Sequence, residues 1–301
     1  MLRCRPGSVA VAVSGGADSL ALAAGLAFER PGSVALVVDH GLQDGSAQVA
    51  ARAAGQCRAL GLAAEVLAAD GSLPDPQHQG AGETAGSGGP EARARALRYR
   101  LLDGAADRLG LVAVLLGHTL DDQAETVLLG LARGAGARAL AGMAPVRGRY
   151  LRPLLDLPRT LTRQACAESG LQPWEDPHNS DPAYARVRTR RLLPELELAL
   201  GPGVARALAR SAAQLREDAD ALDVLAQETG DVDLLAAMAP AVRSRSLKRW
   251  AEARTGRALT GVHVGALRLL VDDWRGQGPV ALPGGGTVSR QGRRLVHRPP
   301  G

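Results

Sequence analysis

The sequence has few cysteines and aromatic residues, and only one lysine. The cysteines are Cys4, Cys57 and Cys166, which lie far apart and form no Cys-x-x-Cys pair. This pattern argues against both a disulfide framework and a zinc site. Lys248 is the only lysine, so arginine supplies nearly all of the positive charge. Because this bias is typical of a GC-rich genome, we do not interpret arginine in place of lysine as a functional signal.

Long apolar runs are also missing. No run reaches the roughly 18 residues that would cross a bilayer, and the N-terminus enters the first predicted strand without a separate signal-peptide region. We therefore expect a cytoplasmic protein with no membrane partner. The net charge of +5 favours, weakly, an anionic partner such as RNA. A length of 301 residues suits one large domain or two smaller ones.

Strands and helices alternate through the first half of the chain. Apolar runs predict strands at 9–13, 33–38, 63–67 and 111–116, with a further extended segment at 152–155. Helices are predicted up to Phe28 and at 46–60, 91–109 and 120–131, and a Gly/Pro-rich loop at 70–90. This order indicates an α/β fold, with a parallel sheet of the five-stranded type and helices on both faces.

The pattern changes in the second half. Helices are predicted at 158–169 and from Tyr184, and 201–203 (Gly-Pro-Gly) has the composition of a linker. The remainder is mainly helical to about residue 273 and ends in a small β-meander over 280–296. We therefore expect a catalytic domain over 1–200 and a smaller, mainly helical domain over 201–301.

The turn after the first strand has the composition of a phosphate-binding loop, although it matches neither GxxxxGK[ST] nor GxGxxG. Ser14-Gly15-Gly16-Ala17-Asp18-Ser19 lies where a buried strand meets the amino end of a helix. Free backbone N–H groups and the helix dipole favour an anion there, and glycine lets a ligand approach closely. Asp18 suits a phosphate site that also holds a divalent cation. The alternative is an ordinary strand–turn–helix junction.

A second polar cluster follows the strand at 111–116. Asp122 and Glu125 lie three residues apart and so share one face of the predicted helix. Thr119 and Asp122 have the spacing of a capping box, so a purely structural role is the alternative. Ligands of parallel sheets bind beyond the carboxyl ends of the strands, where this cluster, Asp39 and the first turn should converge. Two carboxylates there could hold a cationic group or a magnesium ion.

The other candidates are histidines and arginines. His40 and His118 each follow a predicted strand, and each is either a nucleotide contact or a turn residue. Arginine is dense at Arg186, Arg188, Arg190 and Arg191. Such density is typical of phosphate contacts, but also of a charged surface helix.

These motifs resemble a known family. The loop Ser14–Ser19 resembles the SGGxDS loop of the N-type ATP pyrophosphatases. The later motifs narrow the resemblance, over about residues 8–196, to the tRNA(Ile)-lysidine synthetases: 38–42, 91–99, 117–126, 133–136 with 142–143, 152–155, 174–176 with Asn179, and Arg186, Arg190 and 193–194. The chain departs from the family pattern at Gln43, Thr119, Val187 and Thr189. The helical remainder resembles the family's second domain loosely, and we expect the extra C-terminal domain of longer members to be absent.

The resemblance implies an adenine nucleotide alpha hydrolase-like fold and a ligase that forms a carbon–nitrogen bond. The substrate would be the wobble cytidine of an isoleucine tRNA with a CAU anticodon. The carbon-2 carbonyl oxygen of this base would attack the α-phosphate of ATP and release pyrophosphate. The ε-amine of free lysine would then displace AMP and give lysidine.

The resemblance also implies the residues that act. ATP contacts would come from Ser14, Gly15, Gly16, Ala17, Asp18, Ser19, Asp39, His40 and His118. Asp18 would hold Mg²⁺ and take part in catalysis, while Arg95 and Arg190 would neutralise charge at the α-phosphate. Asp122 and Glu125 would bind the α-ammonium group of lysine. The tRNA would contact Arg186, Arg188 and Arg191, and the oligomeric state stays open, with a homodimer as one option.

Two alternatives remain at this point. Another PP-loop enzyme, such as a tRNA thiolase or an amide-forming synthetase, would share the first loop. Thiolases generally need paired cysteines, which this chain does not offer near the loop. A non-catalytic nucleotide- or RNA-binding module is the second alternative. Such a module gains nothing from three carboxylates, at Asp18, Asp122 and Glu125.

Overall fold

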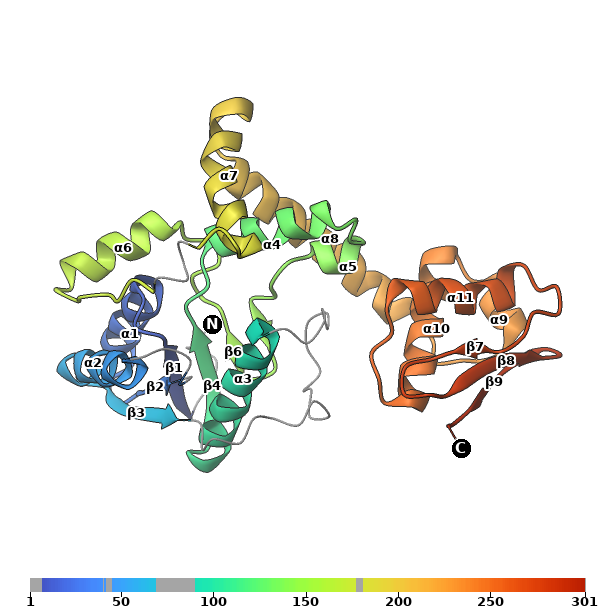
Figure 1. The fold of residues 1–301 in the computed structure, drawn as a ribbon, viewed down its shortest axis with the longest axis horizontal. Coiled ribbons are helices and arrows are strands. Elements are labelled where there is room, and N and C mark those ends of the chain that lie inside the picture. The colour runs from blue at the N-terminus through green and yellow to red at the C-terminus, as the bar shows by residue number, and fades with distance from the viewer. Residues whose placement is uncertain (1–6, 40, 42–44, 69–89, 177–180, 301) are drawn as a thin grey trace. The chain divides into compact units, whose positions relative to one another are not determined.

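The structure, a computed structural model, describes residues 7–39, 41, 45–68, 90–176 and 181–300, with the side chains of 90–92 not described. Cys4, His40, Asn179 and nearly all of the loop expected at 70–90 therefore lie outside the described residues. The chain divides into two compact units, Met1–Ala213 and Gln214–Gly301, and the division falls within helix α8 (Val204–Leu225) (Figure 1). We describe each unit by itself.

Unit 1 is built on a six-stranded sheet with the strand order β3-β2-β1-β4-β6-β5. The strands are β1 (Ser8–Val13), β2 (Val34–Asp39), β3 (Ala63–Ala68), β4 (Leu111–Leu116), β5 (Val146–Arg147) and β6 (Tyr150–Leu151). The first four and β6 pair in parallel, and β5 pairs antiparallel with β6. The predicted parallel sheet is therefore confirmed, with an antiparallel strand added at its edge.

One predicted extended segment, at 152–155, was wrong. The strand ends before it, at Leu151, and residues 153–156 form turns instead. Proline has no N–H group to donate to a strand ladder, which is consistent with the chain leaving the sheet just before Pro153.

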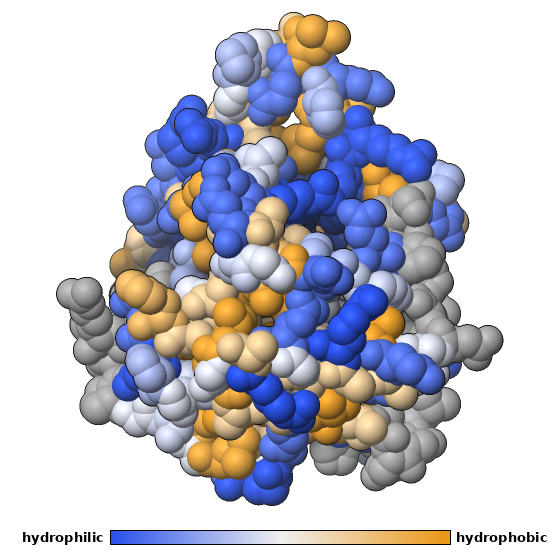
Figure 2. Space-filling model, turned by 90° about the vertical axis from the view of Figure 1, so that its left-hand side faces the viewer, coloured by the Kyte–Doolittle hydropathy of each residue, from blue (hydrophilic) through white to orange (hydrophobic). Residues whose placement is uncertain are grey.

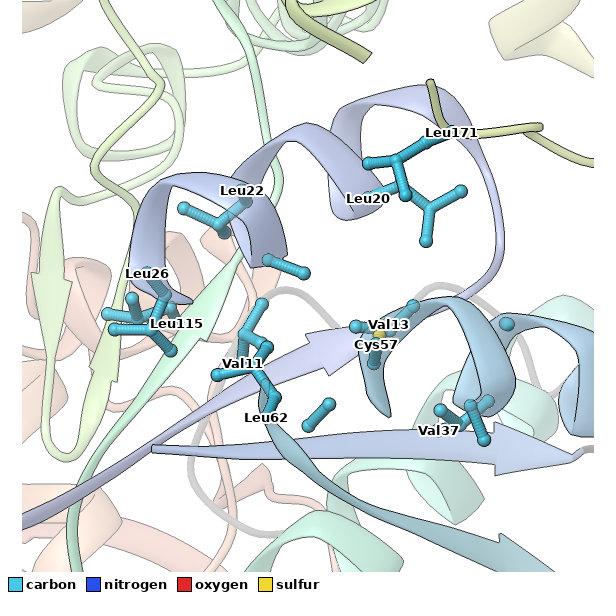
Figure 3. Packing of buried hydrophobic residues seen from close by; sticks show 14 of the residues in the cluster. Val11, Val13, Leu20, Leu22, Leu26, Val37, Cys57, Leu62, Leu115 and Leu171 are labelled. Carbon is cyan, nitrogen blue, oxygen red and sulfur yellow. The ribbon is translucent and has the colours of Figure 1, made fainter. Parts of the chain in front are cut away.

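Helices cover both faces of the sheet, as predicted. The helices of unit 1 before α8 are α1 (Ala17–Glu29), α2 (Ser46–Ala59), α3 (Pro90–Arg108), α4 (Leu120–Ala132), α5 (Ala137–Leu140), α6 (Arg159–Glu168) and α7 (Ala185–Leu200). Successive residues of β1 point to opposite faces, and both faces are apolar, as a buried parallel strand requires. Val11 and Val13 pack with Leu20 and Leu26 of α1 in one core cluster (Figure 3). Ala10 belongs to the cluster on the other face, which includes residues of α3.

The surface of unit 1 is mixed in character. Figure 2 shows hydrophilic and apolar side chains interspersed over one face. Near its end, α7 exposes the side chains of Leu198 and Leu200. Within the described ranges, no helix is both long enough and apolar enough to cross a membrane.

Unit 2 has its own core between helices and a small sheet. Its remaining helices are α9 (Val232–Ala237), α10 (Pro240–Thr255) and α11 (Gly261–Asp272). The antiparallel sheet has the order β7-β8-β9, with β7 (Val280–Ala281), β8 (Thr287–Gln291) and β9 (Arg294–Arg298). Leu235, Leu247, Trp250, Leu267 and Val288 are buried together. The predicted helical region and terminal β-meander are both confirmed.

Candidate active site

The turn between β1 and α1 presents backbone N–H groups at the edge of the sheet. Gly15 has a φ of +86°, which glycine adopts without strain, and Gly16 is the N-cap of α1 with no side-chain cap. Ser19 Oγ donates to Gly16 O at 2.8 Å and accepts from Ser14 N at 3.2 Å, which ties the turn together. Because the first N–H groups of a helix have no intrahelical acceptor, this turn offers the donors that a phosphate needs.

The turn between β4 and α4 lies directly against this loop, because β1 and β4 are neighbours in the sheet. A Cβ atom at Gly117 would lie 3.1 Å from the carbonyl carbon and oxygen of Asp18 and from the Cα of Ser19. Only a residue without a side chain allows so close a backbone approach. The predicted convergence of the first turn and the second polar cluster is thus what the structure contains.

A single guanidinium group joins the acidic residues of these two turns. Arg159 Nε lies 3.2 Å from Asp18 Oδ2, its Nη2 lies 2.5 Å from Asp122 Oδ1, and its Nη1 lies 3.3 Å from Glu125 Oε1. Thr162, one turn further along α6, donates from its hydroxyl to Asp18 Oδ1. Arg159 and Thr162 were not predicted as site residues from the sequence, although a helix was predicted over this segment.

Glu125 is the most deeply buried acid of the cluster. Its side chain is 2% exposed, and it also accepts from Arg190 Nε at 2.7 Å. Asp122 has two roles, because its Oδ2 accepts from Thr119 N at 2.8 Å in a capping box while its Oδ1 faces Arg159. The structural interpretation and the functional interpretation of Asp122 are therefore both compatible with its geometry.

The charges of this cluster stabilise one another. Burial raises the pKa of the Asp122 carboxyl, but Arg159 and the Thr119 N–H group outweigh it and hold that pKa below its ordinary value. Burial lowers the pKa of Arg159, whereas Asp122, Glu125 and Asp18 raise it, and the net result lies above the ordinary value. Both groups are consequently charged at neutral pH.

His118 lies half-buried beside this cluster and is neutral. Burial lowers its pKa to about 3, aided by Arg152 and Arg98 and opposed by Asp122. Its Nδ1 is buried and, in the part of the chain that the structure describes, has no hydrogen-bond partner. Burial and the neighbours Arg95 and Arg186 also lower the pKa of Arg98. These surroundings are positively charged and suit an anionic ligand.

The other predicted residues lie on β2, α3 and α7. Asp39 ends β2 and its Oδ1 accepts from Gly41 N at 3.0 Å, while Arg95 lies 5.1 Å from the ring centre of Tyr99 on α3. The three arginines assigned to tRNA, Arg186, Arg188 and Arg191, are exposed on α7. Of these, Arg188 donates from Nη1 to the carbonyls of residues 182 and 183, which fixes the loop before that helix.

A metal ion would find few protein ligands here. Among the residues that the structure describes, no three His, Cys, Asp or Glu side chains are grouped to hold a metal. Asp18 alone supplies a carboxylate at the phosphate-binding turn. One carboxylate fits Mg²⁺, which commonly takes its other ligands from substrate phosphates and water.

Known proteins resemble this chain over nearly its full length. A PP-loop domain matches residues 4–196, and a TilS substrate binding domain matches residues 231–296. The tRNA(Ile)-lysidine synthase of Leifsonia xyli is 51% identical over 97% of this chain and 90% of its own length. The synthase of Rhodococcus jostii is 53% identical over 93% and 84%. The solved U34-tRNA thiolase NcsA from Methanococcus maripaludis shares the fold, with a TM-score of 0.57 at 20% identity over 71% of this chain and 72% of its own.

Proposed function

The chain belongs to the tRNA(Ile)-lysidine synthase family, and from this premise we propose how its site performs the reaction. The enzyme is a ligase that uses ATP to join lysine to the wobble cytidine of tRNA(Ile) and so forms lysidine. The alternatives, another PP-loop synthetase or a non-catalytic binding module, find no support in relatives that are about half identical over nearly the whole chain. A cytoplasmic location and a homodimer stay predictions.

One observation carries the assignment of roles: the phosphate-binding turn and the acids Asp122 and Glu125 meet in one hydrogen-bonded cluster. An adenylating site must place the α-phosphate of ATP beside the incoming amine. The turn Ser14–Ser19 would hold the pyrophosphate through backbone N–H groups. Asp122 and Glu125 would bind the α-ammonium group of lysine, which leaves its ε-amine free to attack.

The first step forms an adenylated base. The carbon-2 carbonyl oxygen of cytosine attacks the α-phosphate, and pyrophosphate leaves. Arg95 and Arg190 would stabilise the charge that develops there, and neutral His118 would donate a hydrogen bond to the nucleotide. Mg²⁺, held by Asp18 and phosphate oxygens, would supply further charge neutralisation at the pyrophosphate.

The second step joins lysine to the base. The ε-amine attacks carbon 2 of the adenylated cytosine, AMP leaves with the oxygen, and the amine loses a proton. The cytosine must be exposed from its loop, as single-stranded bases of RNA can be. Arg186, Arg188 and Arg191 would contact the tRNA backbone from the exposed side of α7.

The test measures both steps on the purified protein. With ATP, Mg²⁺, labelled lysine and the CAU-anticodon isoleucine tRNA, we expect lysine to enter the tRNA and AMP and pyrophosphate to form. The change Asp18→Asn should lower pyrophosphate release by roughly a hundredfold or more while the fold survives. Asp156→Asn is the matched control, because Asp156 is exposed and outside the cluster. Absence of lysine incorporation would contradict the function, and near-normal activity of Asp18→Asn would show that the catalytic centre lies elsewhere.

A further inference from the structure

Arg159 pairs each of its three guanidinium nitrogens with a different carboxylate. Nε contacts Asp18, Nη2 contacts Asp122 and Nη1 contacts Glu125. The side chain is 14% exposed, so these pairs are shielded from most of the solvent. Nothing in the assignment of roles above accounts for an arginine in this position.

The position of Arg159 is fixed independently of its side chain. Its backbone N–H donates to Asp121 Oδ2 at 2.7 Å, and Leu120 N donates to Leu157 O at 3.0 Å. Arg159 is also the first residue of α6, where the helix dipole disfavours a cation. The three carboxylates outweigh this cost and hold the guanidinium in place.

The contacts of Arg159 coincide with those assigned to lysine. The α-ammonium group of lysine is expected to bind Asp122 and Glu125, whose inward oxygens already accept from Arg159. The ammonium group must therefore displace Nη1 and Nη2 from these oxygens. The Glu125 contact, at 3.3 Å, is long, and Glu125 Oε1 keeps a second partner in Arg190 at 2.7 Å.

We propose that Arg159 binds the α-carboxylate of the substrate lysine, a role that rests on the proposed function of the site. The α-carbon of an amino acid carries a carboxylate beside its ammonium group. When the ammonium group takes over Asp122 and Glu125, the freed face of the guanidinium meets the carboxylate that arrives with it. A guanidinium group pairs with a carboxylate through two parallel N–H bonds, which gives geometric selectivity as well as attraction.

Charge conservation supports this exchange of partners. A buried ionic group is costly when it loses its partner. The head group of lysine carries one positive and one negative charge, so its arrival leaves the net charge of the cluster unchanged. A diamine without the carboxylate would displace Nη1 and Nη2 of Arg159 and bring no anion to replace Glu125 and Asp122, so that only the Nε contact with Asp18 would remain. Arg159 thus selects an amino acid over the corresponding amine.

The experiment compares lysine with cadaverine, which lacks only the α-carboxylate. For each amine, kcat/KM is measured for incorporation into the tRNA by the full-length protein and by Arg159→Gln. Both amines attack the same adenylated intermediate, so any effect of the substitution on the ATP side cancels in their ratio. We expect the wild type to favour lysine, and Arg159→Gln to reduce this preference roughly tenfold or more.

Two variants guard against a merely structural effect. Arg163→Gln, one turn along α6, removes an exposed arginine that lies outside the cluster and should leave the ratio unchanged. Arg159→Lys keeps a positive charge without the forked geometry and should retain only part of the preference. If Arg159→Gln fails to fold, the preference of Arg159→Lys for lysine over cadaverine tests the role of Arg159 instead.

The outcomes separate the two levels of the proposal. A wild type that incorporates no lysine contradicts the function, not the role of Arg159. If the wild type has the same kcat/KM for cadaverine as for lysine, the proposed role of Arg159 is wrong. The same holds if Arg159→Gln lowers both activities equally with the ratio preserved, or if Arg159→Lys, when it decides, keeps the full ratio.

Discussion

The buried negative charge of Glu125 is stabilised by the two arginines that it contacts. Its side chain is 2% exposed and accepts from both Arg159 and Arg190. A charge so deeply buried is stable only when it is paired and hydrogen-bonded. In the proposed function, Glu125 would therefore stabilise the fold and bind lysine through the same carboxylate.

Replacing Glu125 by glutamine should affect lysine more than ATP. The amide keeps the shape but removes the negative charge, so we expect the KM for lysine to rise roughly tenfold or more, with a smaller change for ATP. The free energy of unfolding should fall by about 1–3 kcal/mol, because two guanidinium groups lose a charged partner. Steady-state kinetics and urea unfolding measure the two effects. The exposed Glu195→Gln on α7 serves as control, and equal changes for lysine and ATP would contradict the assignment.

Among the single residues of the site, the three acids were predicted from the sequence, but the arginine between them was not. Asp18, Asp122 and Glu125 each follow a strand, and parallel strands bring such positions to one edge. Arg159 follows Pro158 and begins a helix remote in sequence from the other two turns, so its partners could not be inferred from spacing. A signal was nevertheless present, since a cation at the first position of a helix is unfavourable unless acids lie nearby.

Among the elements, the first turns of α1 and α4 position the site together. Both follow neighbouring strands of the sheet, and a Cβ atom at Gly117 would lie 3.1 Å from backbone atoms of Asp18 and Ser19. This contact explains why the phosphate-binding turn and the acidic helix face are in register. Any side chain at position 117 should therefore displace the turn and destabilise the fold.

The change Gly117→Ala tests this contact. Its Cβ would lie 3.1 Å from backbone atoms of Asp18 and Ser19, which cannot move without shifting the turn. We expect a loss of about 1–3 kcal/mol in the free energy of unfolding, together with reduced pyrophosphate release. The control is Gly104→Ala in α3, where nothing lies within 4 Å of the added atom. The free energy of unfolding of Gly104→Ala, measured by heat or urea, should rise by about 0.5–1 kcal/mol. Equal changes in the two variants would show that the close approach at Gly117 does not constrain the turn.

The elements themselves were predictable where their patterns were long. The strands up to β4 and the main helices follow from apolar periodicity, because each buries a continuous face. Strands β5 and β6 have only two residues each, which is too short for a pattern. Their pairing depends on the neighbouring strand β4 rather than on their own sequence.

On the scale of the molecule, the buried cores belong to separate units. The two clusters around the six-stranded sheet lie within unit 1, and the cluster around Trp250 lies within unit 2. All residues assigned to ATP and lysine belong to unit 1. A ligand of that site should therefore stabilise unit 1 directly.

Unfolding in the presence of ATP tests this separation. We expect calorimetry to resolve two transitions, and the fluorescence of Trp174→Phe, which retains Trp250 and Trp274, to assign one of them to unit 2. At a hundredfold excess over its Kd, ATP stabilises the state that binds it by about 2.7 kcal/mol, or very roughly 5–10 °C for a unit of this size. Only the transition of unit 1 should move. One transition, or two that shift equally, would mean that the units unfold together, and binding energy at the ATP site would then stabilise the core around Trp250 as well.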